Sequence, residues 1–300
     1  MAEAALSPVR WKWMRALRAF AFPLSALPVW VGTAAVLPPA RWRWDVLLIG
    51  TLGVLLFHSA GNLLNDYFDY TSGADHMDEG DDGRPGRLLV RGGMTPAQVL
   101  GEALACLALS VPVWAYIVWR SHPEVLLFIA PAGLALYAYT GPPFRLKARA
   151  LGEPLMVAVF GPLIVGGAAY AQTGRLPTHV VLLSVPVGMA TACVLAANNL
   201  RDYDEDGAAG VQTLAQVIGR RWQRVVYLAL SAGLSVGVAL YGILGPASPV
   251  LAVAPALLLM LAGTFRRVWR GGRIPDVDVR TTRYSTAVMV FLLAVLMLTP

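Results

Sequence analysis

Long apolar runs alternate with short polar or charged segments along most of the chain. A helix that crosses a bilayer needs roughly 20 mostly apolar residues, and nine segments of this chain meet that requirement. The nine segments are residues 16–38, 44–65, 97–119, 124–140, 152–173, 178–199, 223–245, 247–265 and 282–299. Because helices satisfy their backbone hydrogen bonds internally, the pattern predicts an all-α, multi-pass membrane bundle. We expect one domain over residues 1–300 with about nine transmembrane helices.

Composition supports a membrane protein and argues against other classes. The chain is 57% hydrophobic and 14% charged, with a mean hydropathy of +0.59, which is typical of an integral membrane protein. Its two cysteines, Cys106 and Cys193, lie far apart in apolar segments and have no zinc or redox spacing. The net charge of +6 does not indicate nucleic-acid binding, because loop charges set the orientation of a membrane protein.

Basic residues gather on one side of the predicted bundle. All but four of the 24 Lys and Arg residues fall near the N-terminus or in the loops after the second, fourth, sixth and eighth helices. The four exceptions are Arg41, Arg43, Arg120 and Arg175. By the positive-inside rule, the N-terminus is cytoplasmic and the C-terminus lies outside. We therefore expect a protein of the cell (inner) membrane.

A first acidic motif ends the second predicted helix. Asn62, Asn65, Asp66 and Asp69 stand at relative positions 0, 3, 4 and 7, which is one face of an α-helix. A further carboxylate, Asp75, follows in the loop. Carboxylates at membrane depth are expensive and seldom lack a partner, so this motif is expected to bind something.

A second acidic motif ends the sixth predicted helix, on the same side of the membrane. Asn198, Asp202 and Asp206 are spaced by four residues, and Asn199 joins the same helical face. The motif therefore resembles the first in both residue types and position. Two carboxylate-bearing helix ends that are far apart in sequence suggest one shared site.

Together the two motifs predict a metal site. Both contain Asn-x-x-x-Asp-Tyr, which ends at Tyr67 in the first motif and at Tyr203 in the second. Magnesium is usually held by one or two carboxylates together with substrate phosphates, so two facing clusters could hold magnesium ions that bind a diphosphate. Nearby Arg and Lys would neutralise the remaining phosphate charge. The alternative is a solvated acidic loop that stops each helix. The expected metal ligands are Asp66, Asp69, Asp75, Asp202 and Asp206.

Four segments of the chain, in the same order, resemble those of a known family. They are NLLNDYFDYTSGAD (62–75), GRLLVRGGMTPAQ (86–98), YTGPPFRLKARALGE (139–153) with the following FGPLIVGGAAYAQTG (160–174), and NNLRDYDEDGAAGVQTLAQVIGR (198–220). The chain resembles the UbiA superfamily of intramembrane aromatic prenyltransferases, and most of all its MenA branch, the 1,4-dihydroxy-2-naphthoate prenyltransferases. One departure lies between Gly210 and Thr213, where that branch usually has a Lys and this chain has Val211 and Gln212.

The resemblance implies a helical bundle around a central cavity, with a cytoplasmic cap formed by the motif loops. It also implies magnesium-dependent transfer of a polyprenyl group from a prenyl diphosphate to an aromatic quinone precursor. In the MenA branch the acceptor is 1,4-dihydroxy-2-naphthoate, in menaquinone biosynthesis. The expected catalytic residues are Asp66, Asp69, Asp202 and Asp206. The expected diphosphate-binding residues are Asn62, Asn65, Arg84, Arg87, Lys147, Asn198, Asn199 and Arg201. The rings expected to stabilise the allylic cation are Tyr139, Tyr67 and Tyr203.

Two further polar residues have open interpretations. His58 lies one turn before Asn62 on the same helical face, where it either lines the cavity or hydrogen-bonds a neighbouring helix. Glu153 is the last residue of the 139–153 segment, where it matches the family's Gly-Leu-Gly-Glu-like turn, and the resemblance implies that it could orient Lys147 or an arginine.

Several functions share these motifs. The acceptor could instead be 4-hydroxybenzoate, a glycerophosphate lipid or another quinone precursor, or the enzyme could cyclise the prenyl chain without an acceptor. An alternative from a different class is a cation-coupled transporter, whose acids would lie around broken helices at the midplane. The acids of this chain lie at helix ends on one side, which favours an active site near the membrane surface. Membrane lipid is an expected partner and nucleic acid is not, whereas prenyl chain length and oligomeric state are not predicted.

Overall fold

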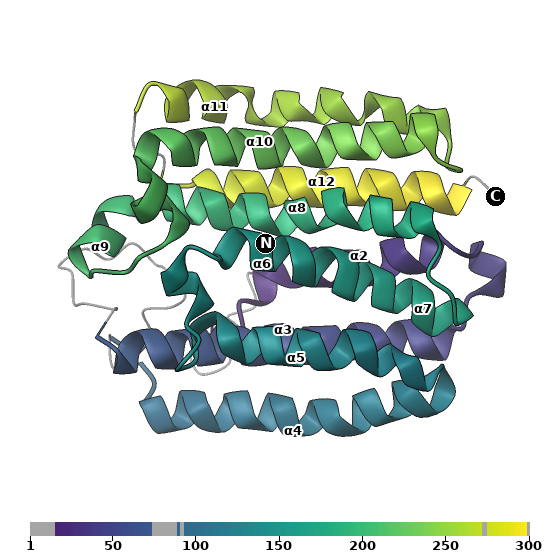
Figure 1. Ribbon diagram of the computed structural model, residues 1–300, viewed down its shortest axis with the longest axis horizontal. Coiled ribbons are helices and arrows are strands. Elements are labelled where there is room, and N and C mark those ends of the chain that lie inside the picture. The colour runs from purple at the N-terminus through teal and green to yellow at the C-terminus, as the bar shows by residue number, and fades with distance from the viewer. Residues whose placement is uncertain (1–15, 74–88, 91–92, 272–274, 299–300) are drawn as a thin grey trace, which may run out of the picture.

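The fold is entirely helical in the part of the chain that the structure describes. The structure, a computed structural model, describes residues 16–73, 89–90, 93–271 and 275–298, and its regular elements are all helices (Figure 1). Eight of them are long and apolar enough to cross a membrane, and a shorter apolar helix, Ala19–Ala34, precedes these. The prediction of an all-α multi-pass bundle of about nine helices is confirmed.

The helical segments correspond one to one with the predicted apolar runs. In chain order they are η1–α2 (Ala19–Ala21, Phe22–Ala34), α3 (Trp44–Thr71), α4 (Pro96–Arg120), η4–α5 (Pro123–Val125, Leu126–Thr140), α6–η6–α7 (Gly152–Ala158, Val159–Gly166, Gly167–Thr173), α8 (Thr178–Arg201), α10 (Leu214–Leu244), η7–α11 (Pro249–Leu261, Ala262–Trp269) and α12 (Val277–Leu298). Short helices outside the bundle are η2 (Pro39–Arg41), η5 (Leu146–Arg149) and α9 (Tyr203–Ala208).

Several helices extend beyond their predicted limits at the end that carries the acidic motifs, and the extensions are longest in α3 and α10. α3 continues past residue 65 to Thr71, so Asp66 and Asp69 are helical. α10 begins at Leu214 rather than at residue 223, and Gly219 with φ 81° interrupts its first turns. Glycine adopts a positive φ without the steric cost that a Cβ would bring. The apolar pattern missed these extensions because the added turns are polar.

The centre of the bundle lies around α8, which packs against α10, α12 and the α6–η6 segment (Figure 1). Its crossing with α6–η6 brings two backbones together. A Cβ on Gly161 would lie 2.4 Å from the Ser184 carbonyl oxygen, and one on Gly188 would lie 2.3 Å from the Val157 carbonyl oxygen. Small residues permit such close approach between membrane helices, and this contact fixes α8 beside the elements that line the cavity.

Both acidic motifs lie at the same end of the bundle, where α9 covers the end of α8 (Figure 1). The Ala150 N–H donates to the Gln212 carbonyl oxygen at 3.1 Å and thereby joins two loops at this end. The expectation of one continuous helical face through the second motif is wrong, since α8 ends at Arg201 and α9 begins after Asp202. A backbone bond of 2.8 Å from the Asp206 N–H to the Asp202 carbonyl oxygen still keeps these residues one turn apart.

Candidate functional site

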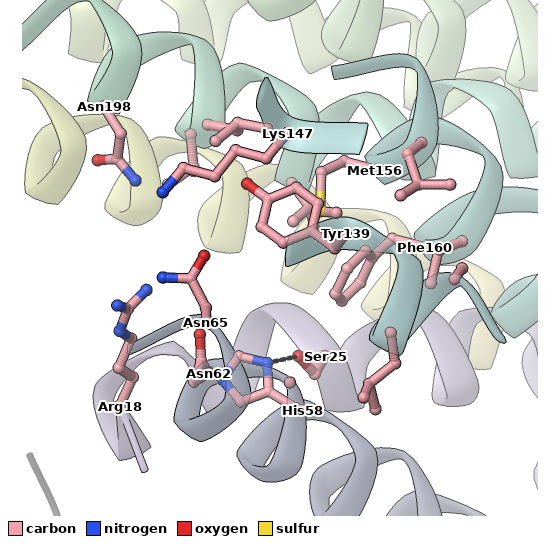
Figure 2. A pocket seen from close by; sticks show the side chains of 18 of the residues that line it. Arg18, Ser25, His58, Asn62, Asn65, Tyr139, Lys147, Met156, Phe160 and Asn198 are labelled. Carbon is pink, nitrogen blue, oxygen red and sulfur yellow. Dashed lines mark hydrogen bonds between the residues drawn. The ribbon is translucent and has the colours of Figure 1, made fainter. Parts of the chain in front are cut away.

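A large cavity, of about 1130 Å³, connects both acidic motifs with the apolar middle of the bundle. Apolar side chains line its inner part, among them Val29, Phe128 and Leu163. The polar residues of the two motifs line its outer end, where Asn65 and Lys147 lie on opposite walls (Figure 2). The cavity therefore has a charged end and an apolar end.

Asp66 of α3 is a buried carboxylate paired with Arg18. The residue is only 5% exposed, and Oδ1 lies 2.6 Å from an Arg18 guanidinium nitrogen. Removing one member of such a buried pair leaves the other charge uncompensated, so the pairing is what permits the burial. Arg18 was expected only to contribute to the basic N-terminus that sets orientation, because no spacing links it to the motif.

The Asp69 carboxylate contacts two other predicted site residues, Asn65 of the same motif and Lys147 of another segment. Its Oδ2 accepts a hydrogen bond of 3.0 Å from the Asn65 amide and lies 2.6 Å from Lys147 Nζ. Burial disfavours the ammonium charge, but the Asp69 carboxylate outweighs that effect and raises the pKa of Lys147. Lys147 therefore remains cationic at the charged end of the cavity.

Asp202 is held by its neighbour in the chain. Two Arg201 nitrogens donate to its two carboxylate oxygens at 2.7 and 2.8 Å, a bidentate arrangement that fixes both groups. Arg201 also pairs with Asp278 in the first turn of α12. Asp278 was not predicted, because the apolar run that indicates this helix begins only at residue 282 and leaves Asp278 in the preceding loop.

Asp206 shows that the two motifs share one electrostatic environment. Burial first of all, and then the neighbouring charges of Asp202 and Asp69, raise the pKa of Asp206 to about 7, while Lys147 opposes the shift. The effect of Asp69 requires proximity, although it belongs to the other motif. Residues of both motifs also line the same cavity, which is the arrangement that the sequence predicts.

The asparagines of the second motif have different surroundings. Asn199 is 6% exposed, and its amide donates to Glu153 Oε1 at 2.9 Å. Gln223 donates to the same oxygen at 2.9 Å, so Glu153 orients two amides rather than Lys147 or an arginine. The Asn198 Oδ1 atom is buried and has no hydrogen-bond partner among the described residues, at the end of the cavity where Lys147 lies (Figure 2).

His58 and Asn62 lie deeper in the cavity on the same face of α3. The Asn62 amide nitrogen is 2.8 Å from His58 Nε2, and Ser25 Oγ of α2 is 2.7 Å from His58 Nδ1. Both interpretations of His58 hold, because the ring lines the cavity and hydrogen-bonds a neighbouring helix.

Of the three predicted tyrosines, Tyr139 alone lines the cavity. Tyr67 packs in an apolar cluster, with its ring 5.3 Å from that of Phe68. The Tyr203 ring lies 4.5 Å from the Arg220 guanidinium. The expectation that Tyr67 and Tyr203 face an allylic cation is wrong, since neither ring reaches the cavity.

The donor set at the charged end suits magnesium. In the described ranges no three His, Cys, Asp or Glu side chains form a ready-made metal cluster, and Asp66, Asp69 and Asp202 each hold a basic side chain. The oxygen donors that Mg²⁺ prefers nevertheless line one end of one cavity. A cation there would offer a partner to the Asn198 oxygen, which has none among the described residues, and would favour the ionised form of Asp206, whose pKa is raised by burial and by neighbouring carboxylates. Three predicted site residues lie outside the described residues: Asp75, Arg84 and Arg87.

The chain is similar in sequence to known proteins over most of its length. Residues 25–276 match the sequence model of the UbiA prenyltransferase family. The chain is 31% identical over 290 residues to "UbiA prenyltransferase domain-containing protein 1" of Xenopus tropicalis, in an alignment that covers 95% of this chain and 81% of that protein. It is 32% identical over 289 residues to the protein of that name from Danio rerio, covering 95% and 83%.

A solved structure shares the fold. A UbiA homolog from Archaeoglobus fulgidus, described as bound to GPP and Mg²⁺, aligns with a TM-score of 0.66 at 20% sequence identity. The alignment covers 95% of this chain and 99% of that one. The likeness extends over the whole bundle, so no large part of the described chain lies outside this architecture.

Proposed function

The chain belongs to the UbiA prenyltransferase family and is thus a prenyltransferase, and we propose that it transfers a prenyl group from a prenyl diphosphate to an aromatic acceptor. The observation that carries this proposal is one cavity with the acids, amides and bases of both motifs at one end and apolar walls beyond. A prenyl diphosphate has the same division into an anionic head and an apolar tail.

The head of the donor would be bound with Mg²⁺, which the Archaeoglobus fulgidus structure is described as containing together with GPP. When bound, the ion neutralises charge on the diphosphate and so stabilises the leaving group. The described carboxylates proposed to hold it are Asp66, Asp69, Asp202 and Asp206. Asn198 offers a further oxygen that has no other hydrogen-bond partner.

The bases of the site would exchange partners when the donor binds. Arg18, Lys147 and Arg201 each neutralise a motif carboxylate in the structure. Once those carboxylates bind metal, the same three cations are free to bind diphosphate oxygens. Arg201 would remain oriented by Asp278, which is not a motif residue.

The inner cavity suits the prenyl chain and the reactive cation. Its apolar walls bind the chain and keep water from the allylic carbon. Tyr139 lines the cavity, and its ring is proposed to stabilise positive charge as the carbon–oxygen bond breaks. Tyr139, Met156 and Phe160 lie together on one wall (Figure 2).

The acceptor that we propose is 1,4-dihydroxy-2-naphthoate, as in menaquinone biosynthesis. Support comes from the NNLRD and YTGPPF segments, which resemble the MenA branch, whereas Val211 is a departure from it. The names of the related proteins from Xenopus tropicalis and Danio rerio specify no acceptor. We further propose that the charged end of the cavity faces the cytoplasm, on the basis of the loop charges.

A product analysis tests the function. Membranes that contain the protein would be incubated with Mg²⁺, geranyl diphosphate and one of several aromatic acceptors, and products and released diphosphate would be measured by mass spectrometry. We expect prenylated, decarboxylated naphthoate to be the main product. If no acceptor gave a product and diphosphate were not released, the proposal would be wrong. Prenylation of 4-hydroxybenzoate alone would change the acceptor and retain the reaction.

The shared site is tested by Asp66→Ala and Asp202→Ala, one from each motif. Each variant is expected to insert in the membrane and to lose transfer activity. Asp45→Ala is a matched control, because Asp45 pairs with Arg120 at 2.9 Å in another part of the structure, away from the motifs. If either motif variant retained most of the transfer activity, that result would contradict a shared site.

A further inference from the structure

Two polar side chains of the cavity, Ser25 and His58, have no role in the mechanism proposed above. Ser25, His58 and Asn62 form a chain of hydrogen bonds from α2 to α3, with distances of 2.7 Å and 2.8 Å on the two sides of the imidazole. All three side chains line the cavity. Among the described residues, His58 is the only histidine that does so.

The position of His58 is deeper than that of the acidic motif. Eight residues of α3 separate it from Asp66, which is about 12 Å along a helix axis. His58 therefore lies farther into the cavity than the carboxylates, on the side toward which the prenyl chain of a bound donor would extend. Figure 2 shows it on the wall opposite Tyr139, Met156 and Phe160.

The ring is also held in one orientation. The Phe22 ring meets it edge-on, with centroids 5.6 Å apart and an interplanar angle of 86°. With the Asn62 amide nitrogen facing the ring, that nitrogen donates and Nε2 carries the lone pair, so Nδ1 carries the proton and donates to Ser25 Oγ. A fixed imidazole with a defined lone pair is the arrangement that general base catalysis needs.

We propose that the Ser25–His58–Asn62 chain binds the hydroxyl of the aromatic acceptor and that His58 accepts the proton of this hydroxyl while the ring attacks the prenyl group. The proposal rests on the proposed function and specifies its substrate class: an aromatic carboxylate with a hydroxyl ortho to the attacked carbon. Asn62 is also a proposed diphosphate-binding residue. When its amide turns to the diphosphate, Nε2 becomes available to the acceptor, so the base is ready only with the donor in place.

His58 takes the hydroxyl proton of the acceptor during the reaction and gives it back at the end. The prenyl C1–O bond breaks and its electron pair leaves with the diphosphate, while the ring carbon forms a new bond to C1. The hydroxyl proton of the acceptor moves to His58 Nε2, and the hydroxyl oxygen becomes the oxygen of a ring ketone. The attacked carbon is the one that carries the carboxylate; the bond between these two carbons then breaks, carbon dioxide leaves, and the electron pair restores the aromatic ring. The resulting phenolate oxygen takes the proton back from His58.

The test compares His58→Asn with the wild type on two acceptors, 1,4-dihydroxy-2-naphthoate and the same compound methylated on the ortho hydroxyl. We expect His58→Asn to lower kcat on the free hydroxyl about a hundredfold, the lower end for loss of a general base. It should alter the rate on the ether and the donor KM by less than about threefold, because neither depends on the proton transfer. His179→Asn is the control, since His179 bonds to the Ala35 carbonyl oxygen and lies outside the cavity lining.

Equal losses on both acceptors would show that His58 only joins two helices, and no loss on either would show that it has no role; both results overturn the proposal. If the wild type does not prenylate the ether, imidazole would be added to the His58→Gly variant. We expect the added imidazole to restore turnover on the free hydroxyl, and the absence of such recovery would refute the proposal. A wild type that is inactive on every acceptor would instead refute the proposed function.

Discussion

The ion pairs at the charged end of the cavity predict that Asp69→Asn will have opposite effects on diphosphate binding and on catalysis. Lys147 Nζ lies 2.6 Å from the Asp69 carboxylate, and both side chains are partly exposed, at 23% and 18%. An amide at position 69 retains the size of the side chain and removes its charge. Lys147 is then free to bind diphosphate in the absence of metal.

The magnitude follows from the contact that is lost. A hydrogen bond between charged groups contributes about 1.5–3 kcal/mol, and solvent screening of this partly exposed pair favours the lower value. About 1.4 kcal/mol corresponds to a factor of ten in affinity. Inorganic diphosphate in EDTA should therefore bind Asp69→Asn about tenfold more tightly than the wild type. Transfer in the presence of Mg²⁺ should fall at least a hundredfold, because loss of a preorganised electrostatic interaction at the reacting group costs about that much.

Isothermal titration of the purified protein in detergent measures the binding, and product formation measures the transfer. Asp45→Asn is the control, since it releases Arg120 from a 2.9 Å pair away from the motifs and should change neither quantity. Lys147→Met combined with Asp69→Asn should abolish the gain. Diphosphate binding to Asp69→Asn that was unchanged or weaker would refute the exchange of partners.

Further predictions concern other groups of the same site. Val211→Lys should lower the donor KM, since Val211 borders a small recess with Asp69 and Lys147; an unchanged KM would show that the missing lysine has no effect. Glu153→Ala should lower the free energy of unfolding by about 2–5 kcal/mol, because two buried amides lose their acceptor. Glu153→Gln, which retains one oxygen, should cost much less, and equal losses of thermal stability would contradict this. Because the pKa of Asp206 is raised to about 7, the protonated form prevails below pH 7 and must lose its proton to bind metal. Titration with Mg²⁺ at pH 7 in buffers of different ionisation enthalpy should thus show proton release that Asp206→Asn lacks.

Helical spacing predicted the geometry of the first acidic motif correctly and that of the second only in part. The i, i+3, i+4 and i+7 spacing of Asn62, Asn65, Asp66 and Asp69 is a local property of a helix, and α3 preserves it through Thr71. In the second motif the same reasoning predicted a continuous face, but the chain turns at Asp202. Spacing by four predicts a helical face only where the helix continues, and the polar turns near a helix end do not determine whether it does.

Partners that are remote in sequence could not be predicted from spacing. Arg18 reaches Asp66 across 48 positions, and Asn199 and Gln223 meet at Glu153 from α8 and α10. Tyr67 and Tyr203 repeat the motif pattern, yet their rings point to an apolar cluster and to Arg220. Which side of a helix faces the cavity depends on how the whole bundle packs.

The sequence by itself determined the membrane class, the nine apolar helices, the two acidic motifs and their common side, because hydropathy and helical periodicity act over one turn or one span at a time. Only the tertiary structure decided that Asp66, Asp69 and Asp202 are each neutralised by a basic side chain, that Glu153 orients Asn199, and that His58 lies beside the apolar part of the cavity. Apart from the Arg201–Asp202 pair of adjacent residues, these contacts join segments that are remote in the chain. They arise from close packing of the bundle, where a buried charged or polar group needs a partner.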